Sequence, residues 1–187
     1  RIATAYLHDD FVLRTRSPRF GGPFSVIESI LHMSDIRQAT RADRDRILDI
    51  AAVSGLFSPD EAEYFAAGFD DWAPEDGDPR RWLVADDGTA AALLAPEAMS
   101  DAVWNLLFLA TRPEARRRGL ARATVAAAET AARAAGARLL LIDTTSGEEQ
   151  APARALYGGL GYDREATIRD YYGDGLDRVT FRKRVGL

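Results

Sequence analysis

The stretch Glu114-Ala115-Arg116-Arg117-Arg118-Gly119-Leu120-Ala121-Arg122 decides how this chain is interpreted. It is rich in arginine at the point where an alanine-rich segment, residues 120–135, is expected to begin a helix. The N-terminus of a helix is the positive end of its macrodipole, so a cationic cluster there is unfavourable by itself. No Ser, Thr, Asp or Asn lies between Ala115 and Leu120 to cap the free amide groups. The segment therefore predicts an anion-binding loop, with a solvated arginine face as the alternative.

The small residues of this loop favour a diphosphate as the anion. Gly119 and Ala121 would let the backbone approach it closely, while the arginines reach a peripheral phosphate. A nucleoside triphosphate loop would end in Gly-Lys-Ser/Thr, but no lysine precedes Lys183. The dinucleotide pattern Gly-x-Gly-x-x-Gly is also missing at this turn, and the glycines of residues 158–161 end a helix. Neither common phosphate motif fits.

Regular elements are expected on both sides of the loop. Thr40 with Asp43 and Ser58 with Glu61 have capping-box spacing, so each predicts a helix start, the second helix ending near Gly68. Apolar segments at 82–85 and 90–95 flank a turn and predict a hairpin. Further strands are expected at 103–111, at 138–143 and on both sides of a turn at 172–175, with a helix at 151–160. The mixture of strands and helices indicates an α/β domain.

Composition narrows the classes of function. The 187 residues suit one domain, and 47% hydrophobic with 28% charged residues is ordinary for a folded protein. The chain has no cysteine, and its two histidines, His8 and His32, precede the first helix start, which argues against cysteine chemistry, a Ser/His/Asp triad and a metal site. A net charge of −5 disfavours nucleic acid and anionic membranes as partners. We expect a cytoplasmic protein without a membrane span.

The first 32 residues differ from the rest. They lack the long apolar segment of a secretion signal, and Asp9 and Asp10 argue against a transit peptide. A second opening, Met-Ser-Asp-Ile-Arg, begins at Met33. We expect residues 1–32 to be an N-terminal extension and residues 33–187 to form a single domain.

Two motifs together carry a resemblance to a known family. Arg116, Gly119 and Ala121 have the spacing of the pyrophosphate loop of the GNAT acetyltransferases, and the loop follows a strand as it does there. A second family element matches about 30 residues later, in Gln150, Ala153, Leu156, Tyr157, Gly161 and Tyr162, with Gln150 in place of the usual Asn. Over about residues 36–187 the chain resembles the GNAT superfamily of acetyl-CoA-dependent N-acetyltransferases.

The resemblance implies a fold and a cofactor site. The fold would be an α/β domain with a mixed, mostly antiparallel sheet flanked by helices and a splayed cofactor cleft between the fourth and fifth strands. Acetyl-CoA would be the cosubstrate, with no metal. The implied cofactor-binding residues are Leu109, Ala110, Thr111, Arg116, Arg117, Arg118, Gly119, Leu120, Ala121, Arg122, Gln150, Ala153 and Tyr157.

It also implies catalytic roles. Tyr157 matches the tyrosine that donates to the departing CoA thiolate, although it could instead merely pack over the cleft. A phenol with a pKa near 10 is about 2 kcal/mol short of protonating a thiolate with a pKa near 8.5. Asn105 stands where several family members have a catalytic Glu, so Asp143 is the nearest candidate base. Asp143 could also be a turn former at a strand end, with water as the proton route.

The acceptor is expected to be a primary amine of a small molecule or a protein. Residues 60–78 contain many acids and no basic residue, which would attract a cationic acceptor or form only a solvated face. Tyr171 and Tyr172 are adjacent in an expected strand, so at most one would face the acceptor. Alternatives are a non-catalytic acyl-CoA sensor, motivated by Asn105, and a domain that binds another phosphate ligand. A monomer and a homodimer are both compatible with the sequence.

Overall fold

The structure, a computed structural model, describes residues 35–186. The extension expected over residues 1–32 lies outside that range. The strands are β1 (Ile36–Gln38), β2 (Arg81–Ala85), β3 (Ala90–Pro96), β4 (Val103–Thr111), β5 (Leu139–Thr145), β6 (Asp163–Gly173) and β7 (Leu176–Arg184). The α-helices are α1 (Arg44–Ser54), α2 (Pro59–Asp70), α3 (Leu120–Ala134) and α4 (Ala151–Gly159), and short 3-10 turns are η1 (Arg41–Asp43), η2 (Pro74–Asp76), η3 (Pro113–Ala115) and η4 (Glu148–Gln150).

The strands form one sheet. It has seven strands in the order β1-β2-β3-β4-β5-β7-β6. Every neighbouring pair is antiparallel except β4 and β5, which are parallel. The predicted fold class, a mixed and mostly antiparallel sheet flanked by helices, is confirmed.

The predicted capping boxes begin the first two helical segments. At Thr40 the backbone N–H donates to Asp43 Oδ2 over 2.9 Å, and at Ser58 the N–H donates to Glu61 Oε2 over 2.7 Å. These bonds satisfy backbone donors that a helix start leaves free. Pro59 occupies the first turn of α2, where its missing N–H costs nothing.

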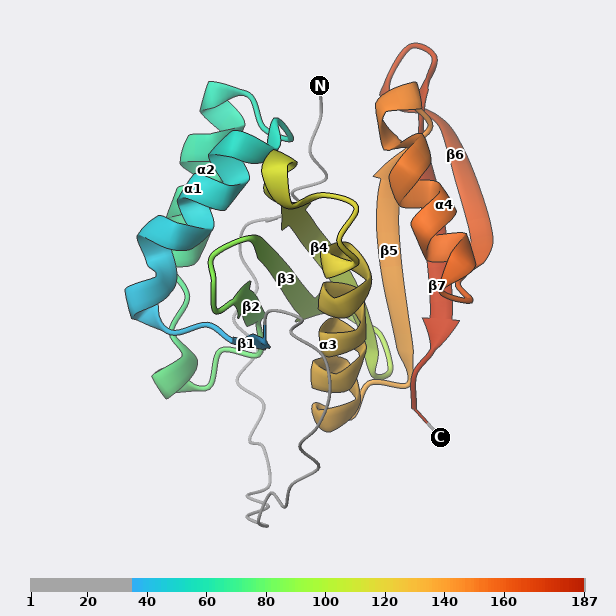
Figure 1. The fold of residues 1–187 in the computed structure, drawn as a ribbon. Helices are drawn as coiled ribbons and strands as arrows, with labels where there is room; N and C mark the ends of the chain where they lie inside the picture. The colour runs from blue at the N-terminus through green and yellow to red at the C-terminus, as the bar shows by residue number, and fades with distance from the viewer. Residues whose placement is uncertain (1–34, 187) are drawn as a thin grey trace.

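Helices cover both faces of the sheet (Figure 1). On one face α1 and α2 bury Ile47 and Phe65 against Trp82 and Phe108. On the other, α3 and α4 pack over a second core, which contains Val125, Ala128, Leu140, Tyr157 and Phe181. The sheet therefore separates two apolar layers, and a path between them must pass through the sheet.

A bulge in β4 changes which side chains face which layer. Leu93 of β3 pairs with Phe108, whereas Leu94 pairs with Leu106, so Leu107 is an extra residue in β4. Leu106 packs in the α3–α4 core, while Phe108 packs in the α1–α2 core. Bulges of this kind bend and twist the strand that contains them.

The parallel pair β4–β5 opens beyond this bulge. Its last paired residues are Leu106 and Ile142. Past that point β4 stays paired with β3 as far as Thr111, and β5 stays paired with β7 as far as Thr145. The two strands therefore diverge, and the predicted splay between the fourth and fifth strands is confirmed; Figure 1 shows β4 and β5 parting at this end.

Three details differ from the sequence predictions. α2 continues to Asp70 rather than ending near Gly68, and β5 runs on to Thr145. The expected alternation of Tyr171 and Tyr172 is wrong, because their ring centroids lie 4.9 Å apart in an edge-to-face contact. Asp170, just before them, has a φ of 55°, in the left-handed region, and the β6–β7 register shifts here. This irregular backbone removes the regular two-residue period.

Candidate active site

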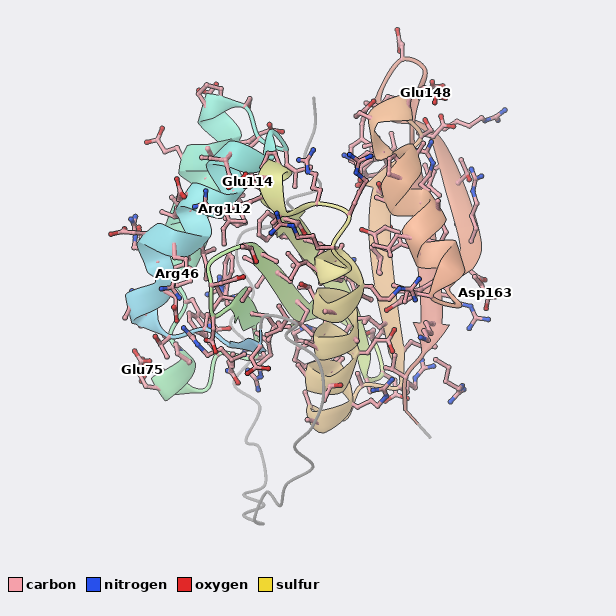
Figure 2. All side chains as sticks on the ribbon, in the orientation of Figure 1. Arg46, Glu75, Arg112, Glu114, Glu148 and Asp163 are labelled. Atoms are coloured by element: carbon pink, nitrogen blue, oxygen red, sulfur yellow. The ribbon has the colours of Figure 1, made fainter. Side chains whose placement is uncertain are left out.

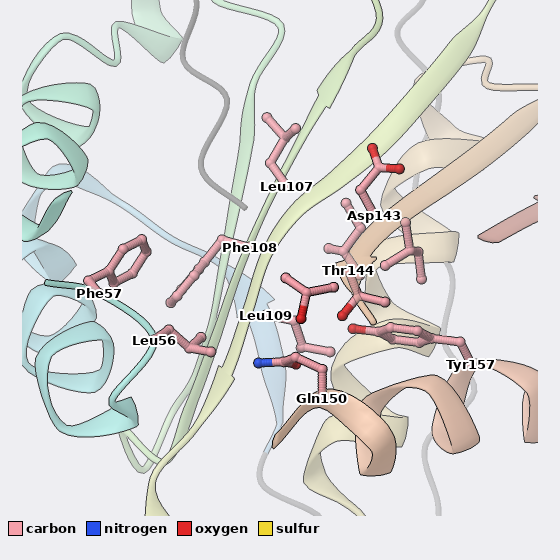
Figure 3. Close-up of a pocket in the computed structure, with 12 residues that line it drawn as sticks. Leu56, Phe57, Leu107, Phe108, Leu109, Asp143, Thr144, Gln150 and Tyr157 are labelled. Atoms are coloured by element: carbon pink, nitrogen blue, oxygen red, sulfur yellow. The ribbon is translucent and has the colours of Figure 1, made fainter. Parts of the chain in front are cut away.

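A pocket occupies the gap between the diverging strands (Figure 3). Residues from both layers line it, so it connects the α1–α2 face of the sheet with the α4 face. The lining residues are Leu56, Phe57, Leu106, Leu107, Phe108, Leu109, Ile142, Asp143, Thr144, Thr145, Gln150 and Tyr157. Four of them, Leu109, Asp143, Gln150 and Tyr157, are among the site residues predicted from the sequence.

Tyr157 enters the pocket from α4. Its ring packs edge-on against Phe181 at 5.5 Å between centroids, and the residue is 6% exposed. Its hydroxyl points towards the side where Thr144 and Gln150 lie in Figure 3, and it makes no hydrogen bond with another residue in the described part of the chain. Burial raises the pKa of the phenol to about 12. The hydroxyl is therefore a protonated donor without a protein acceptor.

Asp143 lies on β5 with its carboxylate fixed by three donors. Thr180 Oγ1 donates to Oδ1 over 2.6 Å, while Arg178 Nη2 and Asn105 Nδ2 donate to Oδ2 over 2.6 and 3.0 Å. The Asp143 side chain is 3% exposed. The partners come from β4 and β7, on either side of β5, so three adjacent strands set the orientation of this carboxylate.

Asn105 links Asp143 to a second carboxylate. Its Nδ2 also donates to Glu97 Oε1 over 2.8 Å, so one amide nitrogen bridges two acids. Its Oδ1 is buried without a hydrogen-bond partner among the described residues. The residue that replaces the family's glutamate is thus part of an acidic network and touches the candidate base directly.

The predicted anion loop lies between η3 and α3. Gly119 has a φ of 83° and Arg117 a φ of 62°, both left-handed, and no side chain caps the first turn of α3. Arg116 Nη2 donates to the carbonyl of Ser54 over 3.1 Å, whereas Arg117, Arg118 and Arg122 are exposed. The free amides and the exposed cations lie at the same helix end, as predicted.

The remaining predicted residues do not line the pocket. Leu120 is buried in a small core with Ala85, Ala90 and Ala115, and Ala121 lies in the first turn of α3. Ala110 faces the α1–α2 layer, and Ala153 packs against the α3–α4 core. Thr111 ends β4 with a buried hydroxyl that has no partner among the described residues.

Several lining residues were not predicted. Leu56 and Phe57 lie in the linker between α1 and α2, and Leu107 and Phe108 lie at the β4 bulge. An apolar pair directly before the capping residue Ser58 was a usable signal, because linkers are rarely apolar without a packing partner. The contacts of Arg178 and Thr180 with Asp143 depend on the register between β5 and β7, and no short stretch of the sequence indicates that register.

The acidic segment 60–78 does not reach the pocket. Arg44 Nη2 donates to Asp70 over 2.7 Å, and Arg80 Nε donates to Asp78 over 2.9 Å, so arginines outside the segment pair with two of its acids. No residue of the segment lines the pocket. Within residues 35–186 no cluster of His, Asp and Glu could hold a metal ion. None of the described helices is long and apolar enough to cross a membrane.

The structure combines a splayed parallel strand pair, an uncapped basic helix start and a tyrosine in the gap, which are the features that the resemblance to the GNAT acetyltransferases implies. The family model of the acetyltransferase (GNAT) family matches residues 44–162, which is more than half of the chain. The chain belongs to the GNAT acetyltransferase family. No curated protein matches it.

Solved structures share the fold. A GNAT-family acetyltransferase from Desulfovibrio desulfuricans is 25% identical with a TM-score of 0.75, over 81% of this chain and 98% of that one. A protein from Salmonella typhimurium described as an acetyltransferase, solved with its cofactor acetyl-CoA, is 19% identical with a TM-score of 0.64, over 81% and 93%. The ribosomal-protein-S18-alanine N-acetyltransferase of Escherichia coli is 20% identical with a TM-score of 0.64, over 83% and 96%.

Proposed function

We propose that this chain transfers the acetyl group of acetyl-CoA directly to a primary amine of a small molecule or a protein. One observation carries the proposal: the gap between β4 and β5 is lined by the unpartnered Tyr157 hydroxyl from α4 and by the Asp143 carboxylate from β5. An acid for the departing thiolate and an acid–base group for the amine are the two groups that such a transfer needs.

The residues around the gap fit acetyl-CoA. Beyond Leu106, β4 has no pairing with β5, which leaves for the pantetheine arm those backbone groups of Leu109, Ala110 and Thr111 that point away from β3. Gln150 and Ala153 of the α4 region would border the same arm. The free amides at Gly119, Leu120 and Ala121 would bind the diphosphate, and Arg116, Arg117, Arg118 and Arg122 would contact the phosphates.

In the reaction the free amine attacks the thioester carbonyl, and a tetrahedral intermediate forms. Its collapse breaks the carbon–sulfur bond and expels the CoA thiolate, and the proton that the nitrogen must lose to become an amide passes to that thiolate or to water. The Tyr157 hydroxyl donates a hydrogen bond, or its proton, to that sulfur. With a phenol pKa of about 12, full proton transfer to a thiolate is about 5 kcal/mol uphill, so hydrogen bonding is the main contribution.

Asp143 serves the amine. An alkylammonium ion must lose a proton before it can attack, and Asp143 supplies the negative charge in the pocket. Its oxygens accept three hydrogen bonds, one of them from the Arg178 guanidinium, but Oδ1 accepts only one of the three. We propose that the second lone pair of Oδ1 attracts the ammonium group and receives its proton directly or through one water molecule. Arg178, Thr180 and Asn105 act through Asp143 as positioning residues.

The experiment is a steady-state assay of CoA thiol release from acetyl-CoA with a panel of primary amines. Amine-dependent release, accompanied by the acetylated amine, supports the proposal. Tight binding of acetyl-CoA with no release across the panel would instead favour a non-catalytic sensor. Asn105, where several members of the family would have a glutamate, is the observation behind that second candidate.

A further inference from the structure

The side of the pocket on the α1–α2 face is apolar. Leu56 and Phe57 come from the linker, and Leu107 and Phe108 come from β4 (Figure 3). The Phe57 ring stacks on Phe108 at 5.8 Å between centroids and lies 4.7 Å from Phe65 of α2. Because Phe57 is held by two rings of the core, this wall is a fixed surface.

One charged side chain lines the pocket, Asp143, and it is already ion-paired with Arg178. Asp143 is the sole carboxylate among the described residues that line it. In Figure 2 the labelled Glu75 and Asp163 lie at the edges of the molecule, away from this gap. A second ammonium group of a ligand would therefore lie against leucine and phenylalanine, where a charge loses its hydration without gaining a partner.

We infer that the acceptor is a monoamine whose amino group is attached to an extended apolar group, alkyl or arylalkyl, rather than a polycation. The amine would lie at Asp143, and the apolar group would lie against Leu56, Phe57, Leu107 and Phe108. This inference rests on the proposed function and specifies the substrate class of the same site. It replaces the acidic segment 60–78 as the source of selectivity.

A series of amines tests the inference. With acetyl-CoA saturating, kcat/KM for thiol release should rise from propylamine to hexylamine by about fourfold for each methylene group buried, and 2-phenylethylamine should be a good substrate. Spermidine and kanamycin should be poorer by at least about tenfold. A preference for spermidine or kanamycin would overturn the inference and leave the proposed function standing. Release with none of these amines would also overturn the inference, and the proposed function would then depend on the wider panel of primary amines, peptide amino groups included.

Substitutions in the apolar wall test whether its residues cause the preference for apolar amines. In Phe57→Ala and in Leu56→Ala, KM for hexylamine should rise about 10-fold with kcat nearly unchanged, because the wall binds ground state and transition state alike. KM for methylamine, which cannot reach the wall, should change less than about twofold. Val53→Ala, an exposed position on α1, is the matched control and should resemble the parent. Equal KM increases for methylamine and hexylamine, in variants whose Tm shows a folded protein, would overturn the inference.

Discussion

The chemistry assigned to Tyr157 depends on its hydroxyl, whereas its ring also packs in the core against Phe181. Tyr157→Phe removes the hydroxyl and keeps the ring. Since the bond to the departing sulfur forms mainly in the transition state, kcat should fall about 10- to 1000-fold while acetyl-CoA affinity stays nearly constant. Steady-state kinetics and calorimetric binding measure the two effects. An unimpaired variant would contradict the acid role.

Burial of Tyr157 also predicts a pH effect on stability. Its pKa is raised from about 10 to about 12 by burial, so on raising the pH the unfolded chain loses this proton first. The stabilisation is complete below pH 10 and is lost as the pH rises towards 12, by about 1.4 kcal/mol between pH 9 and pH 11. Urea unfolding at both pH values should show that Tyr157→Phe loses less stability than the parent. If the parent and Tyr157→Phe lose the same stability between these pH values, the Tyr157 hydroxyl is solvated and its pKa is not raised by burial.

Asp143 is tested with the isosteric amide. Asp143→Asn should lower kcat/KM for the amine about 10- to 1000-fold, because the negative charge that attracts and deprotonates the ammonium group is gone. Arg178 also loses its charged partner, so the Tm must be measured alongside the pH profile. Thr180→Val, which removes one donor to the same carboxylate, is the milder comparison. Undiminished turnover at every pH would leave water as the proton route.

At the residue scale, sequence reasoning identified Tyr157 and Asp143 but not the donors that hold Asp143. Tyr157 could be found from the spacing of the second family motif, because all the residues of that motif lie close together in the sequence. Arg178 and Thr180 meet Asp143 through the pairing of β5 with β7, across more than 30 residues of chain. No local pattern encodes such a register.

At the scale of elements, the start of α3 carries the cofactor proposal. Gly119→Val adds a side chain where no protein atom lies within 4 Å of the new Cβ, but where we place the diphosphate. Acetyl-CoA affinity should fall about 10- to 100-fold by calorimetry. Gly136→Val, at the other end of the same helix with a similar φ of 84° and equally open space, is the control for backbone strain. Equal affinities in the two variants would remove the loop from the site.

Most element boundaries were predictable to within a residue or two, because capping boxes, glycine stops and apolar strands are local signals. The β4 bulge was not, since Leu107 looks like any other apolar strand residue in the sequence. The bulge decides that Phe108 faces α1 and α2. Because the bulge was not predicted, the apolar wall of the pocket, which includes Leu107 and Phe108, was not predicted either.

For the whole molecule, the order of the strands brings the parts of the site together. β4 and β5 are neighbours and parallel, so their carboxyl ends diverge side by side, with α3 following one and α4 following the other. The helices lie on opposite faces of the sheet (Figure 1), and we propose that the two substrates approach the gap from those opposite faces. The family resemblance predicted this topology, whereas composition and hydropathy alone indicated only an α/β domain.

The most direct test of direct acetyl transfer in the β4–β5 gap is a single turnover with acetyl-CoA labelled in its acetyl group. The protein in excess is mixed with labelled acetyl-CoA and the amine that gives the fastest thiol release in steady state, and intact-protein and small-molecule mass spectra are recorded over time. The label should pass to the amine at the rate at which free CoA appears, with the protein mass unchanged throughout. Label retained on the protein, or acetyl-CoA bound and left intact, would contradict direct transfer.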